Sequence, residues 1–108
     1  MNDKVLTLLG FAAKAGELGY GMDSAVSSAV KKKSFLAVAA CDISEKSFKE
    51  LNFRFNKNSV KTVRFENIDI QTLSKAVGHK CGIISINDKG FAEAVLKAYT
   101  QGGNANDE

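Results

Sequence analysis

The chain has 108 residues, of which 15 are Lys or Arg and 12 are Asp or Glu, with one His, two Cys, no Pro and no Trp. This length, with 44% hydrophobic residues, allows one domain with an ordinary buried core that needs neither disulfides nor metal to fold. The composition argues against a disordered chain, and no apolar stretch reaches the roughly 20 residues of a membrane-spanning helix. We therefore expect a cytosolic protein with reduced, buried thiols.

The positive charge lies outside the last seven residues. Residues 102–108 are small and polar and include Asp107 and Glu108, so the formal charge of +3 for the whole chain becomes +5 for the rest. We expect one domain over residues 1–101 and a disordered tail over residues 102–108.

Two groups of basic residues stand out in the sequence. Lys31 to Lys33 form one cluster, and Lys57, Lys61 and Arg64 form a looser one. Such clusters attract polyanions, nucleic acid first, or an anionic membrane surface. A run of three lysines is equally typical of a solvated face, so charge alone does not identify the partner.

Taken in chain order, hydrophobic periodicity first predicts two helices. One runs from Asp3 to about Lys14, and Gly16 is well placed to end it in a left-handed turn. A short extended piece, residues 18–20, then leads to a second helix. Its apolar stripe consists of Met22, Ala25, Val26, Ala29 and Val30.

The middle of the chain predicts two strands around a third helix. Residues 35–41 are all small or apolar, which is typical of a strand covered on both faces. Ser44 or Asp42 is placed to cap a helix with Phe48, Leu51 and Phe55 along one side. Residues 59–65 are rich in β-forming residues but include two basic side chains, which favours a strand nearer an edge.

The last part of the chain repeats the alternation. Asp69 is placed to cap a fourth helix that Gly78 ends, residues 81–86 predict a second fully buried strand, and Asn87 or Asp88 begins the last helix. Helices that alternate with strands in this way predict an α/β fold, with a sheet between layers of helices.

Motifs for catalysis or metal binding are weak. The sequence contains no serine in a nucleophile elbow and only one imidazole for acid–base work. Gly16, Gly19 and Gly21 resemble a phosphate-binding loop but follow a helix and lack the lysine of a P-loop. Neither cysteine has a second ligand at metal-motif spacing. We therefore expect neither an enzyme nor a bound metal or cofactor.

The start of the second helix is a candidate binding site. Gly19 and Gly21 allow close approach of a ligand, and the first turn presents unpaired N–H groups and a partial positive charge to a phosphate or base edge. A glycine turn followed by a solvated, serine-rich face explains the same pattern. The candidate residues on this helix and at its far end are Gly21, Met22, Asp23, Ser24, Ser27, Ser28, Lys31 and Lys32.

Several longer pieces of sequence resemble a known family. The most specific are Ala13-Lys14-Ala15-Gly16-Glu17-Leu18 and Leu73-Ser74-Lys75-Ala76-Val77-Gly78. Residues 35–44 and 87–92 add weaker matches in the expected order. Over most of residues 4–99 the chain resembles the kink-turn-binding ribosomal proteins, the superfamily of the archaeal large-subunit protein seven-Ae and the eukaryotic protein thirty-e, in a bacterial ribosomal-protein-like branch.

The resemblance implies a three-layer α/β/α sandwich around a mixed, four-stranded sheet, and binding of RNA stems with a sharp internal bend. In this family the start of the second helix reads sheared G·A pairs, and a loop before the last strand packs on a flipped-out base. Structured RNA, including ribosomal RNA or the ribosome, is the implied partner of a monomeric protein. The implied contacts outside the second helix are Lys14, Asp42, Ile43, His79, Lys80 and Cys81.

One part of the family pattern is missing. The motif Gly-x-Asn-Glu-x-x-Lys, aligned on Gly21, puts its last three residues on Asp23, Ser24 and Ser27, and one residue further along it puts them on Ser24, Ala25 and Ser28. Either alignment loses the amide and the lysine, which is expected to weaken base readout, although the lysine cluster can still hold a phosphate backbone. The alternative hypothesis is a protein-interaction adaptor of the same fold with little or no kink-turn specificity.

Overall fold

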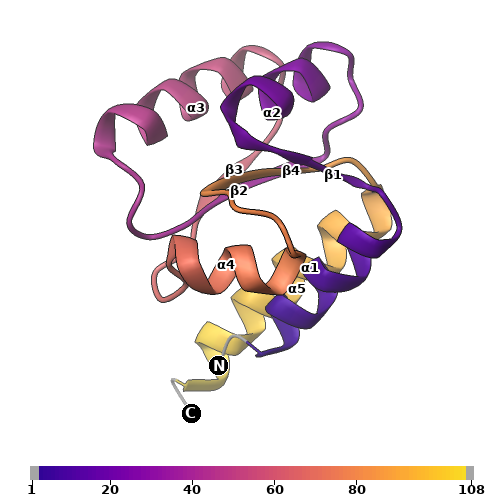
Figure 1. Cartoon of the computed structure of the whole chain (residues 1–108), viewed down its shortest axis with the longest axis vertical. Coiled ribbons are helices and arrows are strands. Elements are labelled where there is room, and N and C mark those ends of the chain that lie inside the picture. Colours follow the sequence, from indigo (N-terminus) through magenta and orange to yellow (C-terminus); the bar gives the residue numbers. More distant parts are fainter. Residues whose placement is uncertain (1–2, 107–108) are drawn as a thin grey trace.

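Helices and strands alternate along the computed structural model, which describes the backbone of residues 3–106 and the side chains of residues 3–100 (Figure 1). The helices are α1 (Asp3–Lys14), α2 (Gly21–Val30), α3 (Glu45–Lys57), α4 (Ile70–Val77) and α5 (Lys89–Asn106). The strands are β1 (Leu18–Tyr20), β2 (Leu36–Ala39), β3 (Thr62–Arg64) and β4 (Ile83–Ile86).

The four strands form one mixed sheet in the order β1-β4-β2-β3. Strand β4 runs antiparallel to both of its neighbours, and β2 runs parallel to β3. Every residue of the central strands β2 and β4 is buried, as their unbroken apolar runs predict. The edge strands β1 and β3 are only partly buried, which confirms the prediction of an edge position for β3.

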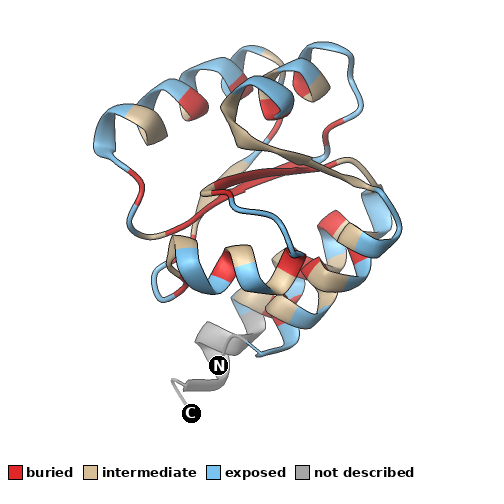
Figure 2. Cartoon of the chain, viewed as in Figure 1, coloured by how far each residue is buried: buried red, intermediate tan, exposed pale blue. Residues whose placement is uncertain are grey.

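Helices cover both faces of this sheet. Figure 1 shows α2 and α3 on one face and α1, α4 and α5 on the other. Buried residues are concentrated in the central strands and on the sides of the helices that face them (Figure 2). The largest fully buried side chains come from all three layers and include Leu9, Leu36, Leu51, Phe55, Phe65, Leu73, Ile84 and Ile86. The fold is therefore the predicted three-layer α/β/α sandwich.

Local capping signals confirm most of the predicted helix ends. The side chains of Ser44, Asp69 and Asp88 each accept a hydrogen bond of 2.8–3.0 Å from the backbone N–H three residues further on. The bond from the Thr72 N–H holds the pKa of Asp69 below its usual value. Gly78 ends α4 in the left-handed conformation, with φ of 72°.

Some predictions about the helices are wrong. Val30, predicted in the apolar stripe of α2, is 61% exposed, because it occupies the last position of the helix and only Ala25 and Ala29 of that stripe are fully covered. Cys41, predicted buried, is partly exposed.

The predicted tail, residues 102–108, begins inside α5. Residues 107–108 lie outside the described residues, and the domain boundary at residue 101 stays a prediction. Within residues 3–106 no helix combines the length and hydrophobicity needed to cross a bilayer.

Candidate RNA-binding surface

An aromatic stack joins two of the predicted contact segments. Tyr20 ends β1 directly before α2, and His79 lies in the loop between α4 and β4. Their rings are parallel to within 6°, with centroids 4.3 Å apart. The stack therefore holds the loop before β4 against the start of α2. Tyr20 is not among the contact residues predicted from the sequence, although an aromatic residue between Gly19 and Gly21 was a usable signal.

The first turn of α2 follows β1 without an intervening loop. Gly21 makes this possible with φ of +85°, a conformation that L residues with a side chain rarely adopt. A Cβ on Gly19 would come within 3.3 Å of the Ser28 hydroxyl, so α2 packs closely over β1. The N-cap residue Tyr20 makes no side-chain hydrogen bond to the helix. The first N–H groups of α2 are therefore available to an anionic or carbonyl ligand.

The polar side chains of α2 divide between two faces. Asp23, Ser24 and Ser27 are exposed beside the first turns, as predicted. Ser28 was predicted on the same face, but it lies beside Ala25 on the side that faces the sheet. Its hydroxyl accepts a 3.1 Å hydrogen bond from the Asn87 side-chain amide, so it ties α2 to the end of β4. Met22, which is partly buried, packs against the core.

The loop after β2 lies next to the loop before β4. A Cβ on Gly82 would come within 2.9 Å of the Ile43 side chain, and only a glycine allows this approach. The carboxylate of Asp42 accepts a 2.9 Å hydrogen bond from the Ile70 N–H at the start of α4. Ile43 is buried and Asp42 is exposed, so the acidic side chain is the one that faces solvent beside the His79 loop.

Of the three predicted contact residues in the loop before β4, one is buried and two are exposed. Cys81 is only 8% exposed, and its N–H donates a 3.0 Å hydrogen bond to the hydroxyl of Ser74 in α4. Burial raises the pKa of the Cys81 thiol to about 11, so the thiol is neutral at ordinary pH. The pKa of Tyr20 is also raised, mainly by its own burial and then by Cys81. His79 and Lys80 are exposed and form the solvent-facing part of this loop.

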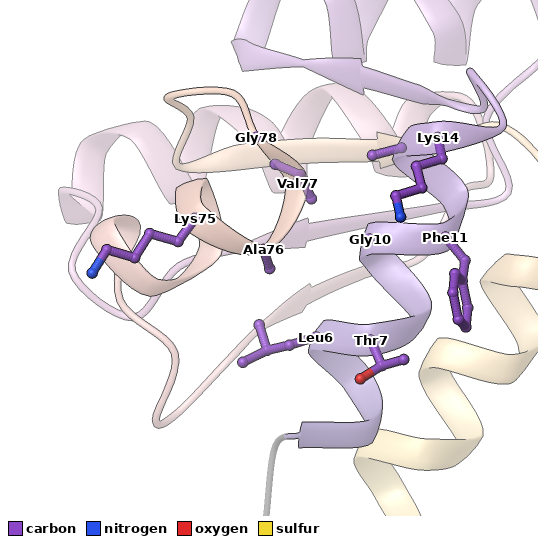
Figure 3. A pocket seen from close by; sticks show the side chains of 10 residues that line it. Leu6, Thr7, Gly10, Phe11, Lys14, Lys75, Ala76, Val77 and Gly78 are labelled. Atoms are coloured by element: carbon purple, nitrogen blue, oxygen red, sulfur yellow. The ribbon is translucent and has the colours of Figure 1, made fainter.

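Lys14, in the last turn of α1, lies near the start of the loop before β4. A groove of about 430 Å³ separates α1 from α4, and its lining includes Lys14 in the last turn of α1 and Gly78 at the end of α4 (Figure 3). The two helices approach closely at Gly10, where a Cβ would come within 3.1 Å of the Ala76 carbonyl oxygen. Because Gly78 directly precedes His79, this groove lies beside the start of the loop before β4.

The two predicted basic clusters differ in how exposed their side chains are to a ligand. Lys31, Lys32 and Lys33 are all exposed at the C-terminal end of α2, about 15 Å from Gly21 along the helix axis. The looser cluster is broken up by internal contacts. Arg64 donates hydrogen bonds to the carbonyl oxygens of Cys41 (3.2 Å) and Ile43 (2.8 Å) and pairs with Glu45. Arg64 therefore fixes the loop after β2 instead of facing a ligand.

The larger share of the net positive charge lies in the part of the chain that contains α2 and α3. Residues 21–58, which include α2 and α3, contain seven basic and four acidic residues, a formal charge of +3. The other described residues, 3–20 and 59–106, contain eight basic and six acidic residues, a formal charge of +2. The part of the chain that contains α2 and α3 therefore carries +3 of the +5 on the described residues, and it includes the start of α2 beside the Tyr20–His79 stack.

Comparisons with known proteins identify the fold. No protein-family model and no curated protein matches the chain. A protein of unknown function from Bacillus halodurans has a similar structure, with a TM-score of 0.84, 24% identity, and coverage of 90% of this chain and 97% of the other. The 15.5kD RNA binding protein of Giardia lamblia has a TM-score of 0.68 and 17% identity, over 91% of this chain and 83% of its own. At these identities the likeness is one of fold, so the chain shares its α/β/α sandwich with an RNA-binding protein.

Proposed function

We propose that this chain binds structured RNA with a sharp, kink-turn-like bend, through the N-terminus of α2 and the loop from His79 to Cys81. The observation that carries the proposal is the Tyr20–His79 stack, which joins these two segments into one surface. The Giardia protein of the same fold is an RNA-binding protein, and this supports the proposal. The positive layer of α2 and α3 supports a polyanionic ligand in the same place.

Each part of the surface has a chemical role in this proposal. The free N–H groups of the first α2 turn face a phosphate or base edge, and Asp23, Ser24 and Ser27 supply carboxylate and hydroxyl partners for base amino groups. His79 is held flat by Tyr20, so its outer face offers a platform for a splayed base. Lys14 and Lys80 pair with phosphates at the edges.

In this proposal the protein binds RNA without catalysis, as a monomer in the cytoplasm. Its physiological partner is ribosomal RNA or the ribosome.

We expect a kink-turn stem to bind about tenfold more tightly than the same stem with its tandem G·A pairs replaced by Watson–Crick pairs, because base-edge contacts are lost. Fluorescence anisotropy over a range of salt concentrations measures both affinities. Equal, weak binding of the two stems contradicts kink-turn specificity.

Variants at His79 test the site itself. His79→Ala removes the platform and is expected to weaken binding of the kink-turn stem, whereas His79→Phe keeps a flat ring on Tyr20 and retains most of the affinity. Lys97→Ala is the matched control, because Lys97 is exposed on α5 in the opposite layer. If His79→Ala and Lys97→Ala have the same effect, the loop is not part of the RNA interface.

A specific observation favours a second candidate function. The Asn, Glu and Lys of the kink-turn motif are replaced in both alignments. They fall on Asp23, Ser24 and Ser27 in one and on Ser24, Ala25 and Ser28 in the other. An adaptor that binds proteins has no need of those residues. Affinity purification after ribonuclease treatment distinguishes the two functions: protein partners that survive digestion support the adaptor, and loss of all partners supports RNA binding.

A further inference from the structure

Two apolar side chains are exposed on the positive layer. Val30 at the end of α2 and Phe53 in α3 are each 61% exposed. They face a groove of about 440 Å³ between the two helices. This volume lies in the range of roughly 300–1,000 Å³ that is typical of pockets for small organic groups. The groove is lined by Val26, Val30, Glu50, Phe53, Arg54, Lys57 and Asn58.

The rim of this groove is basic. The ammonium group of Lys57 lies 4.5 Å from the centre of the Phe53 ring, in a cation–π contact. Glu50, the acidic residue among those lining the groove, pairs with Arg54 at 3.2 Å, so its charge is compensated. The exposed lysines 31–33 follow Val30 directly in the chain. The groove therefore combines an exposed aromatic ring with basic side chains, which is the combination that holds unpaired nucleotides in other proteins.

We propose that this groove binds an unpaired nucleotide of RNA, with the base stacked on Phe53 and the flanking phosphates paired with Lys57 and the lysines at 31–33. An amphipathic peptide fits the groove less well, because a docked helix needs several apolar anchors at successive turns. Here only Val30 and Phe53 are well exposed and apolar among the lining residues. A single base needs one aromatic platform, and its phosphates match the charge of the rim.

The groove is continuous with the proposed RNA surface, and this step rests on the proposed function. Gly21 and Val30 stand at opposite ends of α2, about 14 Å apart along its axis. That distance corresponds to about four nucleotides of a stacked strand. A stem bound at the start of α2 can therefore place a short single-stranded extension in the groove, beside Phe53.

Binding of defined RNAs to Phe53 variants tests the groove. The probes are a kink-turn stem with blunt ends, the same stem with a uridine extension, and oligouridine alone. Phe53→Ala is expected to weaken binding of the extended stem and of oligouridine by about tenfold, because a stacked base is lost, and to leave the blunt stem unchanged. Phe53→Tyr keeps the ring and the affinity. Phe35→Ala is the matched control, since Phe35 is 48% exposed but lines a different groove, beside Lys61 and Lys89.

The outcomes separate the two proposals. If Phe53→Ala binds both the extended stem and oligouridine as tightly as the unchanged protein does, the nucleotide site is overturned. An acidic, phenylalanine-containing peptide serves as a further probe. The nucleotide site is also overturned if the protein prefers this peptide to oligouridine and the preference depends on Phe53. Phe53-dependent binding of oligouridine, with no preference for the bent stem over a straight one, keeps the groove and refutes kink-turn binding. Because Phe53 is exposed, its replacement is not expected to prevent folding.

Discussion

At the scale of single residues, burial decides which members of the His79 loop can act on a ligand. The resemblance implies an apolar loop that packs on a flipped-out base. The least polar member here, Cys81, faces inward, and its backbone is held by the Ser74 hydroxyl. In the proposed complex, contact with a base therefore falls to the ring of His79, which is stacked on Tyr20. The thiol contributes to packing and not to recognition.

The raised pKa of Cys81 predicts a distinctive pH profile for its reaction with iodoacetamide. The reactive form is the thiolate, so in the folded protein the rate is expected to rise about tenfold per pH unit until the pH approaches 11. The folded pKa lies above the reference value of 9.0. The stability that the neutral thiol provides is therefore complete below pH 9 and is lost as the pH rises towards 11.

Mass spectrometry of a Cys41→Ser variant follows this reaction, because Cys81 is then the one remaining thiol. The same variant in denaturant is the control, and its rate is expected to level off near the reference pKa of 9.0. Circular dichroism shows over which pH range the protein stays folded. A folded-state rate that also levels off near 9.0 contradicts a buried, neutral thiol.

At the scale of helices and strands, local signals were sufficient for most of the fold. The caps at Ser44 and Asp69 and the left-handed end at Gly78 depend on residues within one turn, so the sequence contains all the information. The central strands were predictable because full burial on both faces leaves a continuous apolar run. The order of the strands was not predicted, since periodicity does not specify which strands pair, and the family resemblance implied only a mixed, four-stranded sheet.

The errors concern contacts between elements. Arg64 was assigned to a basic cluster, but its partners are backbone carbonyl groups more than 20 residues away. Val30 fits an apolar stripe by spacing, yet it lies where α2 ends beside an open groove. The stack of Tyr20 on His79 joins residues 59 positions apart. Such pairs depend on how whole elements pack, which a local pattern does not encode.

A pair of glycines tests whether the start of α2 binds RNA. Gly21 and Gly16 both have positive φ, +85° and +74°, and a Cβ on either would have no neighbour within 4 Å. Each Gly→Ala change therefore costs backbone strain alone, about 1–2 kcal/mol of unfolding free energy. Only Gly21→Ala is expected to weaken RNA binding, since it distorts the N–H groups of the first α2 turn.

Urea denaturation measures the cost in stability, and anisotropy with the kink-turn stem measures the affinity. Gly16→Ala is the control for strain at an equivalent turn that ends α1. If both variants lose the same stability and the same affinity, the effect of Gly21→Ala comes from general destabilisation. In that case the start of α2 has no special part in binding.

At the scale of the whole molecule, positive charge is denser in the layer of α2 and α3 than in the rest of the described chain. Residues 21–58 carry +3 over 38 positions, and the other described residues, 3–20 and 59–106, carry +2 over 66 positions. A polyanion is therefore attracted towards the face that holds α2 and α3, before any specific contact forms. In the proposed complex, this orientation allows one strand of RNA to contact both the α2 N-terminus and the Phe53 groove, which lie on this layer.

Two triple variants with equal charge test that orientation. Replacing Lys31, Lys32 and Lys33 with Ala removes three positive charges from the positive layer, and replacing Lys4, Lys89 and Lys97 removes three from the other layer. All six side chains are exposed, so neither variant is expected to unfold.

Each phosphate contact adds about 0.7–0.9 to the slope of log affinity against log salt. The first variant is therefore expected to reduce that slope by about two, and the second by much less than one. Because the net charge falls equally in both, a difference between the slopes reports where the backbone of the RNA lies. Equal slopes mean that the RNA responds to total charge, and the lysines at 31–33 then make no direct contact.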